Sequence, residues 1–395
     1  MEGNRGEGRK DRPCPVANKC GGCRYIGMPY AEQLRQKQKT VEQLLEKYGK
    51  INKIIGMDVP EHYRNKVHAV FDFQKGRGIV SGIYQEGTHH VVPVEQCLLE
   101  DRKADEIILS IRELAKSFKY KTYNEDTGYG LLRHVLIRVG HTTGQIMVVL
   151  VLSSPILPSR KNFVNALCKL HPEITTIVLN VNNKRTSMVL GDKEQVLYGK
   201  GYIEDRLCGR TFRISPKSFY QVNAVQTEKL YGKALEYAAL TGSETVIDAY
   251  CGIGTISLFL AQKAGQVYGI EVVPRAVADA RENAAENGIA NAEFFVGKAE
   301  EVLPEWYESH PGKAADVIVV DPPRKGCEEG LLRTMVRMAP KRIVYVSCNS
   351  ATLARDLKYL CAGGYRLERV QPVDMFPMTV GVEVVCLLSN LNQIS

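Results

Sequence analysis

Cys348 is the side chain of this sequence best placed to act as a nucleophile. It lies in I-V-Y-V-S-C-N-S-A-T-L-A-R-D at 343–356, where β-branched and aromatic residues precede it and an apolar helical pattern follows. These patterns predict a buried strand, a turn at Cys348 and a helix. A thiol near a helix N-terminus at the mouth of a sheet can have its pKa lowered toward the thiolate, although many free cysteines are simply small buried side chains. The neighbouring motifs favour the chemical interpretation.

Two carboxylates lie at similar positions elsewhere in the chain. Asp321 opens D-P-P-R directly after an apolar strand, and two prolines fix the dihedral angles of the loop that follows. Such a stiff loop is typical of methyltransferases that act on nucleobases. Glu383 lies in V-E-V-V-C-L-L, where a carboxylate is costly unless it is paired or transfers protons.

A glycine-rich turn, A-Y-C-G-I-G-T, follows the expected strand at 245–248 and precedes a helix through Leu260. Such a turn lets a ligand approach the backbone closely. It lacks the third glycine of the dinucleotide fingerprint, and no G-K-[ST] follows, so a P-loop is excluded. Glu271 ends the next strand, where an acid can bind ribose hydroxyls. The combination suits S-adenosylmethionine as well as NAD.

Four cysteines near the N-terminus form a possible metal site. Cys14, Cys20 and Cys23 lie in C-P-V-A-N-K-C-G-G-C, and Cys97 is the next cysteine along the chain. Sets of sulfur ligands suit zinc or an iron–sulfur cluster. The lone distant fourth cysteine favours the iron–sulfur cluster over zinc, and either metal over free thiols.

The composition sets the broad class of the protein. A chain of 395 residues is too long for one ordinary core, and 44% hydrophobic and 24% charged residues are typical of a globular protein. Neither a membrane span nor a signal peptide is apparent, so we expect a cytoplasmic protein whose eleven cysteines serve as thiols, ligands or catalysts. The net charge of +8 is compatible with a polyanionic partner.

The hydrophobic patterns divide the chain into three stretches. Residues 1–50 contain a basic, glycine-rich tail, the cysteine loop and a helix, and residues 51–213 read as an α+β domain. Residues 214–395 begin with a helix capped by Asn223 and continue as alternating strands and helices. This last pattern predicts a doubly wound, Rossmann-like α/β sheet, closed by an antiparallel strand pair that carries Glu383.

The central stretch shows no catalytic constellation. His89 and His90 are adjacent, so on a strand they would face opposite ways. An RNA-facing sheet and an ordinary solvated face are equally compatible with its basic residues, which are Arg64, Lys66, Lys75, Arg77, Arg133 and Arg138.

Taken together, the motifs resemble the RNA uracil-C5 (5-methyluridine) methyltransferases, in their 23S ribosomal RNA branch. The resemblance spans nearly the whole chain, and its motifs occur in the family's order. They are C-x5-C-x2-C with a later cysteine, S-F-Y-Q-V-N at 218–223, D-A-Y-C-G-I-G-T at 248–255, D-P-P-R-K-G at 321–326, S-C-N-S-A-T-L-A-R-D at 347–356 and D-M-F-P-M-T at 374–379 before Glu383.

The resemblance implies a role for each matching position. Cys348 would be the nucleophile that adds to C6 of uracil, and Glu383 the base that removes the C5 proton. The target nucleotide would be flipped out of the RNA, with Phe219, Tyr220 and Phe376 as candidate stacking partners. Gln221, Tyr250, Glu271 and Asp321 would bind S-adenosylmethionine or shape its pocket, and a [4Fe–4S] cluster would be held by Cys14, Cys20, Cys23 and Cys97.

The sequence also departs from the family pattern. Ser350 replaces a proline, Gly381 replaces a histidine, and the cluster begins too early to leave room for the OB-like (TRAM) domain that many members carry. We therefore expect a monomer that binds 23S rRNA through its central domain and cluster region, with tRNA as the alternative RNA. Two alternative functions are a cytosine-C5 RNA methyltransferase and a non-catalytic metal-containing RNA-binding protein. The position of Cys327, near but outside the P-P step, argues against the cytosine activity.

Overall fold

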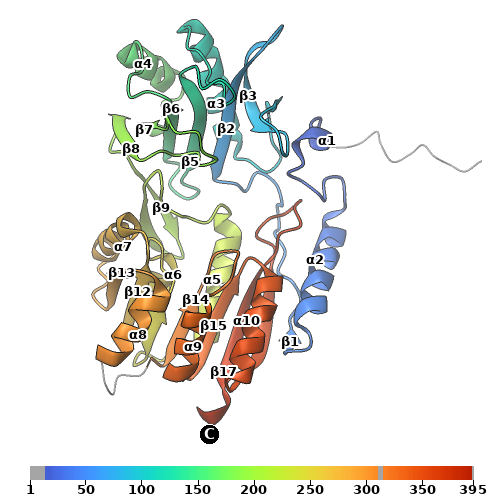
Figure 1. Cartoon of the computed structure of the whole chain (residues 1–395), viewed down its shortest axis with the longest axis vertical. Coiled ribbons are helices and arrows are strands. Elements are labelled where there is room, and N and C mark those ends of the chain that lie inside the picture. The colour runs from blue at the N-terminus through green and yellow to red at the C-terminus, as the bar shows by residue number, and fades with distance from the viewer. Residues whose placement is uncertain (1–13, 310–314, 394–395) are drawn as a thin grey trace, which may run out of the picture.

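The computed structural model describes residues 14–309 and 315–393, and its two large β-sheets lie one above the other along the long axis of the molecule (Figure 1). The basic tail expected at 1–12 lies outside the described residues. No helix in the described part of the chain is long and apolar enough to cross a membrane.

The C-terminal sheet has eight strands in the order β1-β16-β17-β15-β14-β11-β12-β13. The strands from β15 to β13 run parallel, whereas β17 is antiparallel to both of its neighbours, β15 and β16. Sequence patterns had indicated this antiparallel closing pair. The strands are β1 (Lys50–Ile51), β11 (Thr245–Asp248), β12 (Gln266–Glu271), β13 (Ala292–Val296), β14 (Val317–Val320), β15 (Arg342–Ser347), β16 (Tyr365–Val373) and β17 (Glu383–Asn390).

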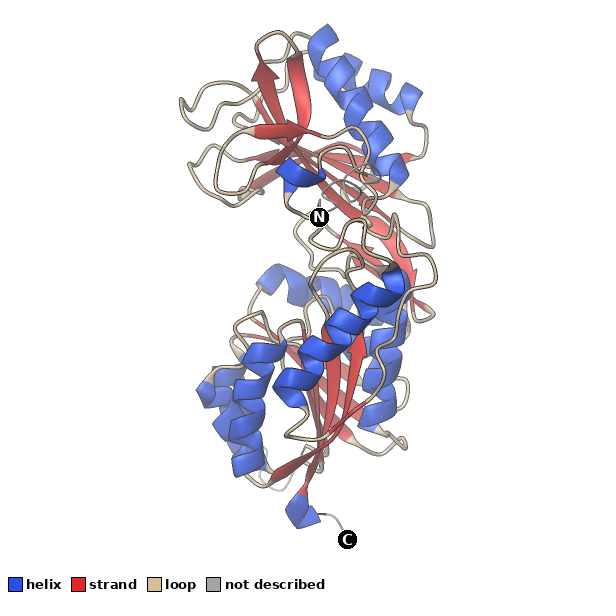
Figure 2. Ribbon diagram, turned by 90° about the vertical axis from the view of Figure 1, so that its right-hand side faces the viewer, coloured by secondary structure: helices blue, strands red, loops and turns tan. Residues whose placement is uncertain are grey.

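Helices cover both faces of this sheet (Figure 2). One hydrophobic cluster joins the sheet to α5 (Ala224–Ala238), α6 (Thr255–Leu260) and α7 (Pro274–Glu286). A second cluster joins the other face to α2 (Tyr30–Leu45), α8 (Ala299–Ser309), α9 (Glu329–Met338) and α10 (Ser350–Ala362). The short 3-10 helix η1 (Leu391–Gln393) follows the last strand. The doubly wound fold expected from the sequence is confirmed.

The N-terminal segment contributes to this same sheet. Strand β1 pairs in parallel with β16. Val41, Leu45 and Ile54 are buried in the hydrophobic cluster on the face of the C-terminal sheet that α8, α9 and α10 cover. The expected boundary at residue 50 therefore cuts through one core, because β1 and the residues after it complete the C-terminal sheet. The three-way division of the chain stays a prediction.

The central sheet has seven strands in the order β4-β3-β2-β5-β6-β7-β8. Helices α3 (Arg102–Ser117) and α4 (Arg160–Leu170) cover one face, and Asp101 caps α3 by accepting from the amides of Lys103 and Ala104. The strands are β2 (Lys66–Gln74), β3 (Gly78–Tyr84), β4 (Val91–Pro93), β5 (Leu132–Val139), β6 (Ile146–Leu152), β7 (Ile174–Val181) and β8 (Lys193–Tyr198).

A hairpin of β9 (Ile203–Leu207) and β10 (Arg210–Ile214) lies between the two sheets. Its apolar residues join the cluster that also contains Leu136 and Met147 of the central sheet and Tyr231 of α5. The two parts of the molecule therefore share a continuous apolar core.

Two of the basic residues offered for an RNA-facing sheet are buried instead. Arg133 is 1% exposed and forms a bidentate pair with Glu125. Arg138 is 3% exposed and donates to the carbonyls of Pro216 and Ser218. Neither guanidinium belongs to an open solvated face.

Candidate active site

The glycine-rich turn after β11 is held by Glu271 at the end of β12. The amide of Gly252 donates to Oε2 of Glu271 at 3.2 Å, and the amide of Val273 donates to Oε1 at 2.8 Å. Gly254 has φ +84°, and a Cβ there would lie 3.3 Å from Ala280 and Phe294. The turn therefore requires glycine at this position, and it lies against the Glu271 carboxylate; the binding of ribose hydroxyls by this acid stays a prediction.

Asp248 ends β11 beside this turn and was not singled out from the sequence. It is fully buried, and it accepts a 2.6 Å hydrogen bond from the Ser257 hydroxyl. Burial raises its pKa to about 6, with the hydrogen bond from Ser257 opposing the shift. Its place directly before a glycine turn was the available signal.

Cys348 and Asp321 meet at the carboxyl edge of the sheet. Asp321 follows β14, Cys348 follows β15, and these strands are parallel neighbours. Parallel strands present their carboxyl ends at the same edge, where doubly wound sheets bind ligands. Cys348 is half-buried, and both Asp321 and Glu383 lie within electrostatic range of its thiol.

Glu383 reaches this edge from the opposite chain direction. It is the first residue of β17, and Val384 pairs with Ser347 at the end of β15. Because β17 is antiparallel to β15, its beginning lies beside the end of β15. Glu383 is 4% exposed, and its Oε2 makes no hydrogen bond with any described residue. A buried, unpartnered carboxylate oxygen is suited to accept a proton.

Burial shifts the pKa values of both carboxyl groups upward. It raises the pKa of Glu383 to about 7. Burial, followed by the charges of Glu383 and Asp248, raises the pKa of Asp321 well above its usual range. Both shifts favour the protonated acids, because burial and a neighbouring negative charge disfavour ionisation of a carboxyl group.

The expected lowering of the pKa of Cys348 is wrong in direction. Burial raises this pKa, and the charges of Glu383 and Asp321 raise it further, while Arg324 lowers it. A helix N-terminus does not offset two nearby carboxylates. The resting side chain is therefore a thiol, and the thiolate needs additional positive charge or loss of the negative charges around it.

Hydrogen bonds fix the D-P-P-R loop to helix α10. The side-chain amide of Asn349 and the Thr352 hydroxyl both donate to the Arg324 carbonyl at 3.1 Å. Asp356, buried in the same helix, accepts from the Cys327 amide at 2.8 Å and from the Tyr345 hydroxyl at 2.6 Å. These contacts hold the residues after Asp321 and those after Cys348 as one unit.

Tyr250 contributes to this supporting network. It is half-buried in the glycine turn, and its hydroxyl and the thiol of Cys327 are hydrogen-bonded. Cys327 is 4% exposed, and burial raises its pKa to about 12. Cys327 is therefore a protonated core residue and lacks the properties of a second nucleophile.

Tyr231 on α5 lies beneath the site and was missed by sequence reasoning. It is 2% exposed, and its hydroxyl forms a 3.2 Å hydrogen bond with that of Thr255. Burial raises its pKa, as do the charges of Asp321, Glu383 and Asp248. The pKa of this single hydroxyl therefore depends on all three buried carboxylates. No sequence motif marks it, because it is one apolar position among several on an amphipathic helix.

The segment 218–223 borders the site and carries Gln221. The Asn65 amide group donates to the Gln221 carbonyl at 3.1 Å, and Asn223 donates to the Met375 carbonyl at 3.1 Å. The side chain of Gln221 is buried and forms no hydrogen bond within the described part of the chain. Gln221 therefore has free hydrogen-bonding groups beside the loop that leads to Glu383.

The three candidate stacking aromatics differ in exposure. Phe219 is 66% exposed, whereas Tyr220 is 4% exposed and its hydroxyl donates to Asp205. Phe376 is half-buried, and a Cβ on Gly381 would lie 3.1 Å from its ring. Phe219 presents the accessible ring, and Gly381 leaves room for Phe376 where a larger residue would press on it.

The four cysteines near the N-terminus do not form a closed ligand set. Cys20 and Cys14 lie within electrostatic range of Cys23 around the short helix α1 (Ala17–Cys20). Cys23 and Cys97 pack on the same small apolar cluster, which contains Tyr63. Within residues 14–309 and 315–393, however, no group of three or more His, Cys, Asp or Glu residues has the arrangement of a metal site. The sulfurs are neighbours, and the expected convergence of all four is not seen.

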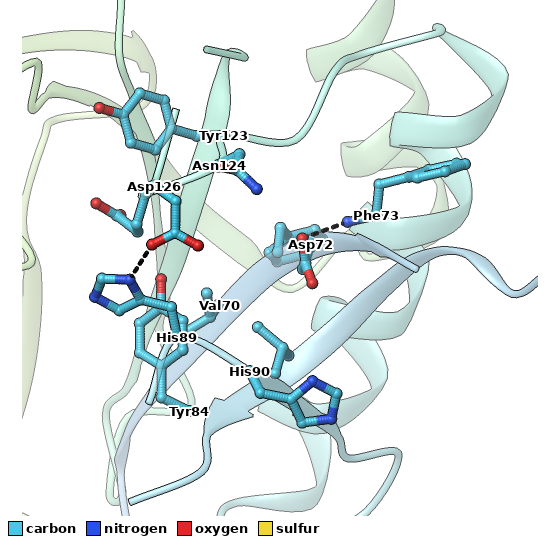
Figure 3. Close-up of a pocket in the computed structure, with 12 residues that line it drawn as sticks. Val70, Asp72, Phe73, Tyr84, His89, His90, Tyr123, Asn124 and Asp126 are labelled. Atoms are coloured by element: carbon cyan, nitrogen blue, oxygen red, sulfur yellow. Dashed lines mark hydrogen bonds and ion pairs between the residues drawn. The ribbon is translucent and has the colours of Figure 1, made fainter. Parts of the chain in front are cut away.

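A separate cavity of about 400 Å³ lies on the central domain (Figure 3). It contains none of the candidate catalytic or cofactor-binding residues. His89 and His90 both line it from the turn before β4, so their expected placement on opposite faces of a strand is wrong. His89 bonds Asp126 at 2.8 Å, and Asp72 adds a further carboxylate to the lining. This acidic wall does not suit RNA phosphate.

The fold and the sheet-edge site define a Rossmann-like, S-adenosylmethionine-dependent methyltransferase. The chain superimposes on the crystal structure of a Pyrococcus abyssi tRNA (uracil-54, C5)-methyltransferase in complex with S-adenosyl-L-homocysteine, with a TM-score of 0.76. The two chains are 28% identical, over 91% of this chain and 83% of the other.

Sequence comparison places the chain in one family. A family model described as tRNA (Uracil-5-)-methyltransferase matches residues 29–391. An uncharacterized RNA methyltransferase of Halalkalibacterium halodurans is 51% identical over 97% of this chain and 84% of its own length. One of Bacillus cereus is 50% identical over 98% and 84%. The chain belongs to the tRNA (uracil-5-)-methyltransferase family, and it is an RNA methyltransferase of the EC 2.1.1 class.

Proposed function

We propose that the protein methylates C5 of uridine in RNA through a covalent bond between Cys348 and C6 of the base. The observation that carries this proposal is the meeting of Cys348, Asp321 and Glu383 at one edge of the sheet, beside the glycine turn held by Glu271. A nucleophile, a partly protonated carboxylate pair and a cofactor turn are the groups that this reaction needs.

The reaction begins at Cys348. The half-buried Cys348 thiol would first lose its proton to solvent, which Arg324 favours. Addition of the Sγ thiolate to C6 would then move the C5–C6 π electrons onto C5 and O4. S-adenosylmethionine supplies the methyl group as an electrophilic sulfonium substituent. C5 would form its new bond to the methyl carbon as the methyl–sulfonium bond breaks and S-adenosylhomocysteine leaves. The C5 proton would then pass to the ionised Glu383 carboxylate. The electron pair of the C5–H bond would restore the C5–C6 double bond while the S–C6 bond breaks and releases the Cys348 thiolate.

The cofactor pocket is proposed along the turn between β11 and α6. Glu271, fixed by two backbone amides, would bind the ribose hydroxyls, and the free amide group of Gln221 would contact the cofactor. Tyr250 would form a wall of the pocket, since its hydroxyl is engaged with Cys327. Asp321 follows β14, which lies between β11 and β15, so it would bind the cofactor or shape its pocket on the side of Cys348.

We propose 23S rRNA as the substrate, with tRNA as the second candidate because the solved relative acts on tRNA. A cytosine-C5 activity is disfavoured by the burial and high pKa of Cys327. The enzyme would act as a cytoplasmic monomer. Nucleoside analysis of RNA methylated by the pure protein, followed by mapping in a deletion strain, identifies both the base and the RNA. Product 5-methylcytidine, or no methylated nucleoside, would contradict the proposal.

RNA that contains 5-fluorouridine tests the covalent step. Fluorine replaces the proton that Glu383 would remove, so the methylated adduct should persist as a band that survives denaturation. Cys348→Ala should form no adduct, and Cys327→Ala should form as much as wild type. In Glu383→Gln, addition and methyl transfer remain possible, so this variant should accumulate adduct on ordinary uridine RNA. Adduct formation by Cys348→Ala would refute the nucleophile assignment.

We also propose a [4Fe–4S] cluster held by Cys14, Cys20, Cys23 and Cys97. The support is chemical: three thiols share one loop, and Cys97 packs on the same apolar cluster as Cys23. Binding would draw the four sulfurs into a closed set and would tie the N-terminal loop to the central domain. Anaerobic purification should give a brown protein with about four irons, as four cysteine ligands imply. A colourless protein that contains zinc, or no metal at all, would disprove the cluster.

A further inference from the structure

Lys66 and Arg138 are directly opposite each other in the antiparallel ladder of β2 and β5. Like charges at such paired positions destabilise a sheet. Lys66 forms no hydrogen bond or ion pair with any residue that the structure describes. Burial lowers its pKa to about 8, and the neighbouring Arg138 and Arg64 contribute to the shift. The sheet thus contains a cation pair without a countercharge.

The lack of a countercharge at Arg138 is specific to this position on β5, because a second buried arginine on the same strand has one. The Arg138 guanidinium donates to the carbonyls of Pro216 and Ser218, and its Nε has no partner among the described residues. Arg133, on the same strand and equally buried, has its charge matched by Glu125. Uncompensated buried charge is unfavourable, and such exceptions to local rules concentrate at functional positions.

The cation pair borders the catalytic region. Arg138 holds the carbonyl of Ser218, and the exposed ring of Phe219 follows directly in the chain. Asn65, next to Lys66, donates to the Gln221 carbonyl. Proteins commonly bind single-stranded nucleic acid with positive charge beside an accessible aromatic ring. The positive charge binds the phosphate backbone, and the ring stacks on a base.

We propose that Lys66, backed by Arg138 and flanked by Arg64, binds a phosphodiester of the RNA next to the target uridine. This inference rests on the proposed function, because it presumes that the uridine is presented at Cys348. The bound phosphate supplies the missing countercharge, and the carbonyl contacts of Arg138 hold its guanidinium in place. The carboxylate of S-adenosylmethionine is an alternative anion for the same site. The exposed ring of Phe219 favours the RNA phosphate, since it can stack on the adjacent base.

Lys66→Met tests this assignment, with Lys75→Met as the control. Lys75 is exposed on the turn after β2, so its replacement by Met removes the same charge from the same domain. Binding of a uridine-containing RNA oligonucleotide should weaken roughly tenfold for Lys66→Met, and the slope of log K against log salt should fall by about 0.7, the value for one single-strand phosphate. Lys75→Met should change neither by as much. Affinity for S-adenosylhomocysteine should be unchanged in both.

Thermal unfolding separates a binding role from a structural one. Since Lys66 faces a like charge, Lys66→Met should unfold at the same temperature as wild type or higher, and Lys66→Arg should retain RNA binding. Equal RNA affinities for Lys66→Met and Lys75→Met would overturn the phosphate assignment. Loss of S-adenosylhomocysteine affinity with RNA binding intact would assign the site to the cofactor. Because these assays measure binding, their failure is distinct from absence of 5-methyluridine in the wild-type product.

Discussion

The buried pair of Lys37 and Asp374 gives the sharpest stability prediction. Both side chains are 0% exposed, and Nζ of Lys37 lies 2.5 Å from Oδ1 of Asp374 and 2.9 Å from the Phe376 carbonyl. Tyr30 donates to Oδ2 of Asp374 at 2.9 Å. The pair joins α2 to the loop that leads to Glu383, so it connects the N-terminal helix to the active site.

Lys37→Met should destabilise the protein by about 3–5 kcal/mol, because it leaves the Asp374 carboxylate buried with one remaining donor. For the C-terminal domain this corresponds to a fall of roughly 10 °C in unfolding temperature. The matched control is Lys39→Met, an exposed position on the same helix, which should change stability by less than about 0.5 kcal/mol. Calorimetry or denaturant unfolding measures both.

The double variant Lys37→Met, Asp374→Leu should recover most of the lost stability, because replacing a buried ion pair with apolar side chains is often nearly neutral. Tyr30 keeps a hydrogen bond in this variant, since its hydroxyl also accepts from the Met57 amide at 2.8 Å. Methylation should still be reduced, because the loop loses the lysine contact to Phe376. A loss below about 1 kcal/mol in Lys37→Met, or a double variant no better than the single ones, would refute this reasoning.

Three further predictions concern the site itself. Burial raises the pKa of Glu383 to about 7. The buried side chain is tolerated while it is protonated, and it costs stability as the pH rises through 7. Glu383→Gln should therefore raise the unfolding temperature more at pH 8 than at pH 5. The methylation rate of wild type should rise over the same pH range, as the base loses its proton, and a flat profile would argue against Glu383 as the base. Asn223→Ala removes the cap of α5 and the contact to Met375, and unfolding should show a loss of about 1–2 kcal/mol, whereas a change near zero would contradict the role of the cap.

The positions of Cys348, Asp321 and Glu271 at strand ends could be predicted from the sequence because each one ends or follows an apolar strand. That pattern is local, and parallel strands carry it to one edge of the sheet. The antiparallel run of β17 could also be read from the chain. Its position between β15 and β16 could not, since strand order depends on contacts between segments far apart in sequence. That order decides that Glu383 lies beside Cys348.

Other properties depend on surroundings that a linear pattern does not contain. Burial raises the pKa of Cys348, and carboxylates contributed by two other parts of the sheet, Glu383 and Asp321, raise it further. Burial and the charges of three acids from separate parts of the chain raise the pKa of Tyr231. Strand β1 joins a sheet whose other strands lie far downstream in the sequence. The exposure of Phe219 and the burial of Tyr220 are opposite outcomes for adjacent aromatic residues with the same local signal. Tertiary packing distinguishes them.

The place of β17 in the sheet also makes the proposed site depend on one strand. Cys348 follows β15, whereas Glu383 opens β17, which lies between β15 and β16 and is antiparallel to both. A change that displaces β17 would therefore separate Glu383 from Cys348, although the parallel strands from β15 to β13 could stay paired. The same change would detach β16, and β1 with it, from the rest of the sheet.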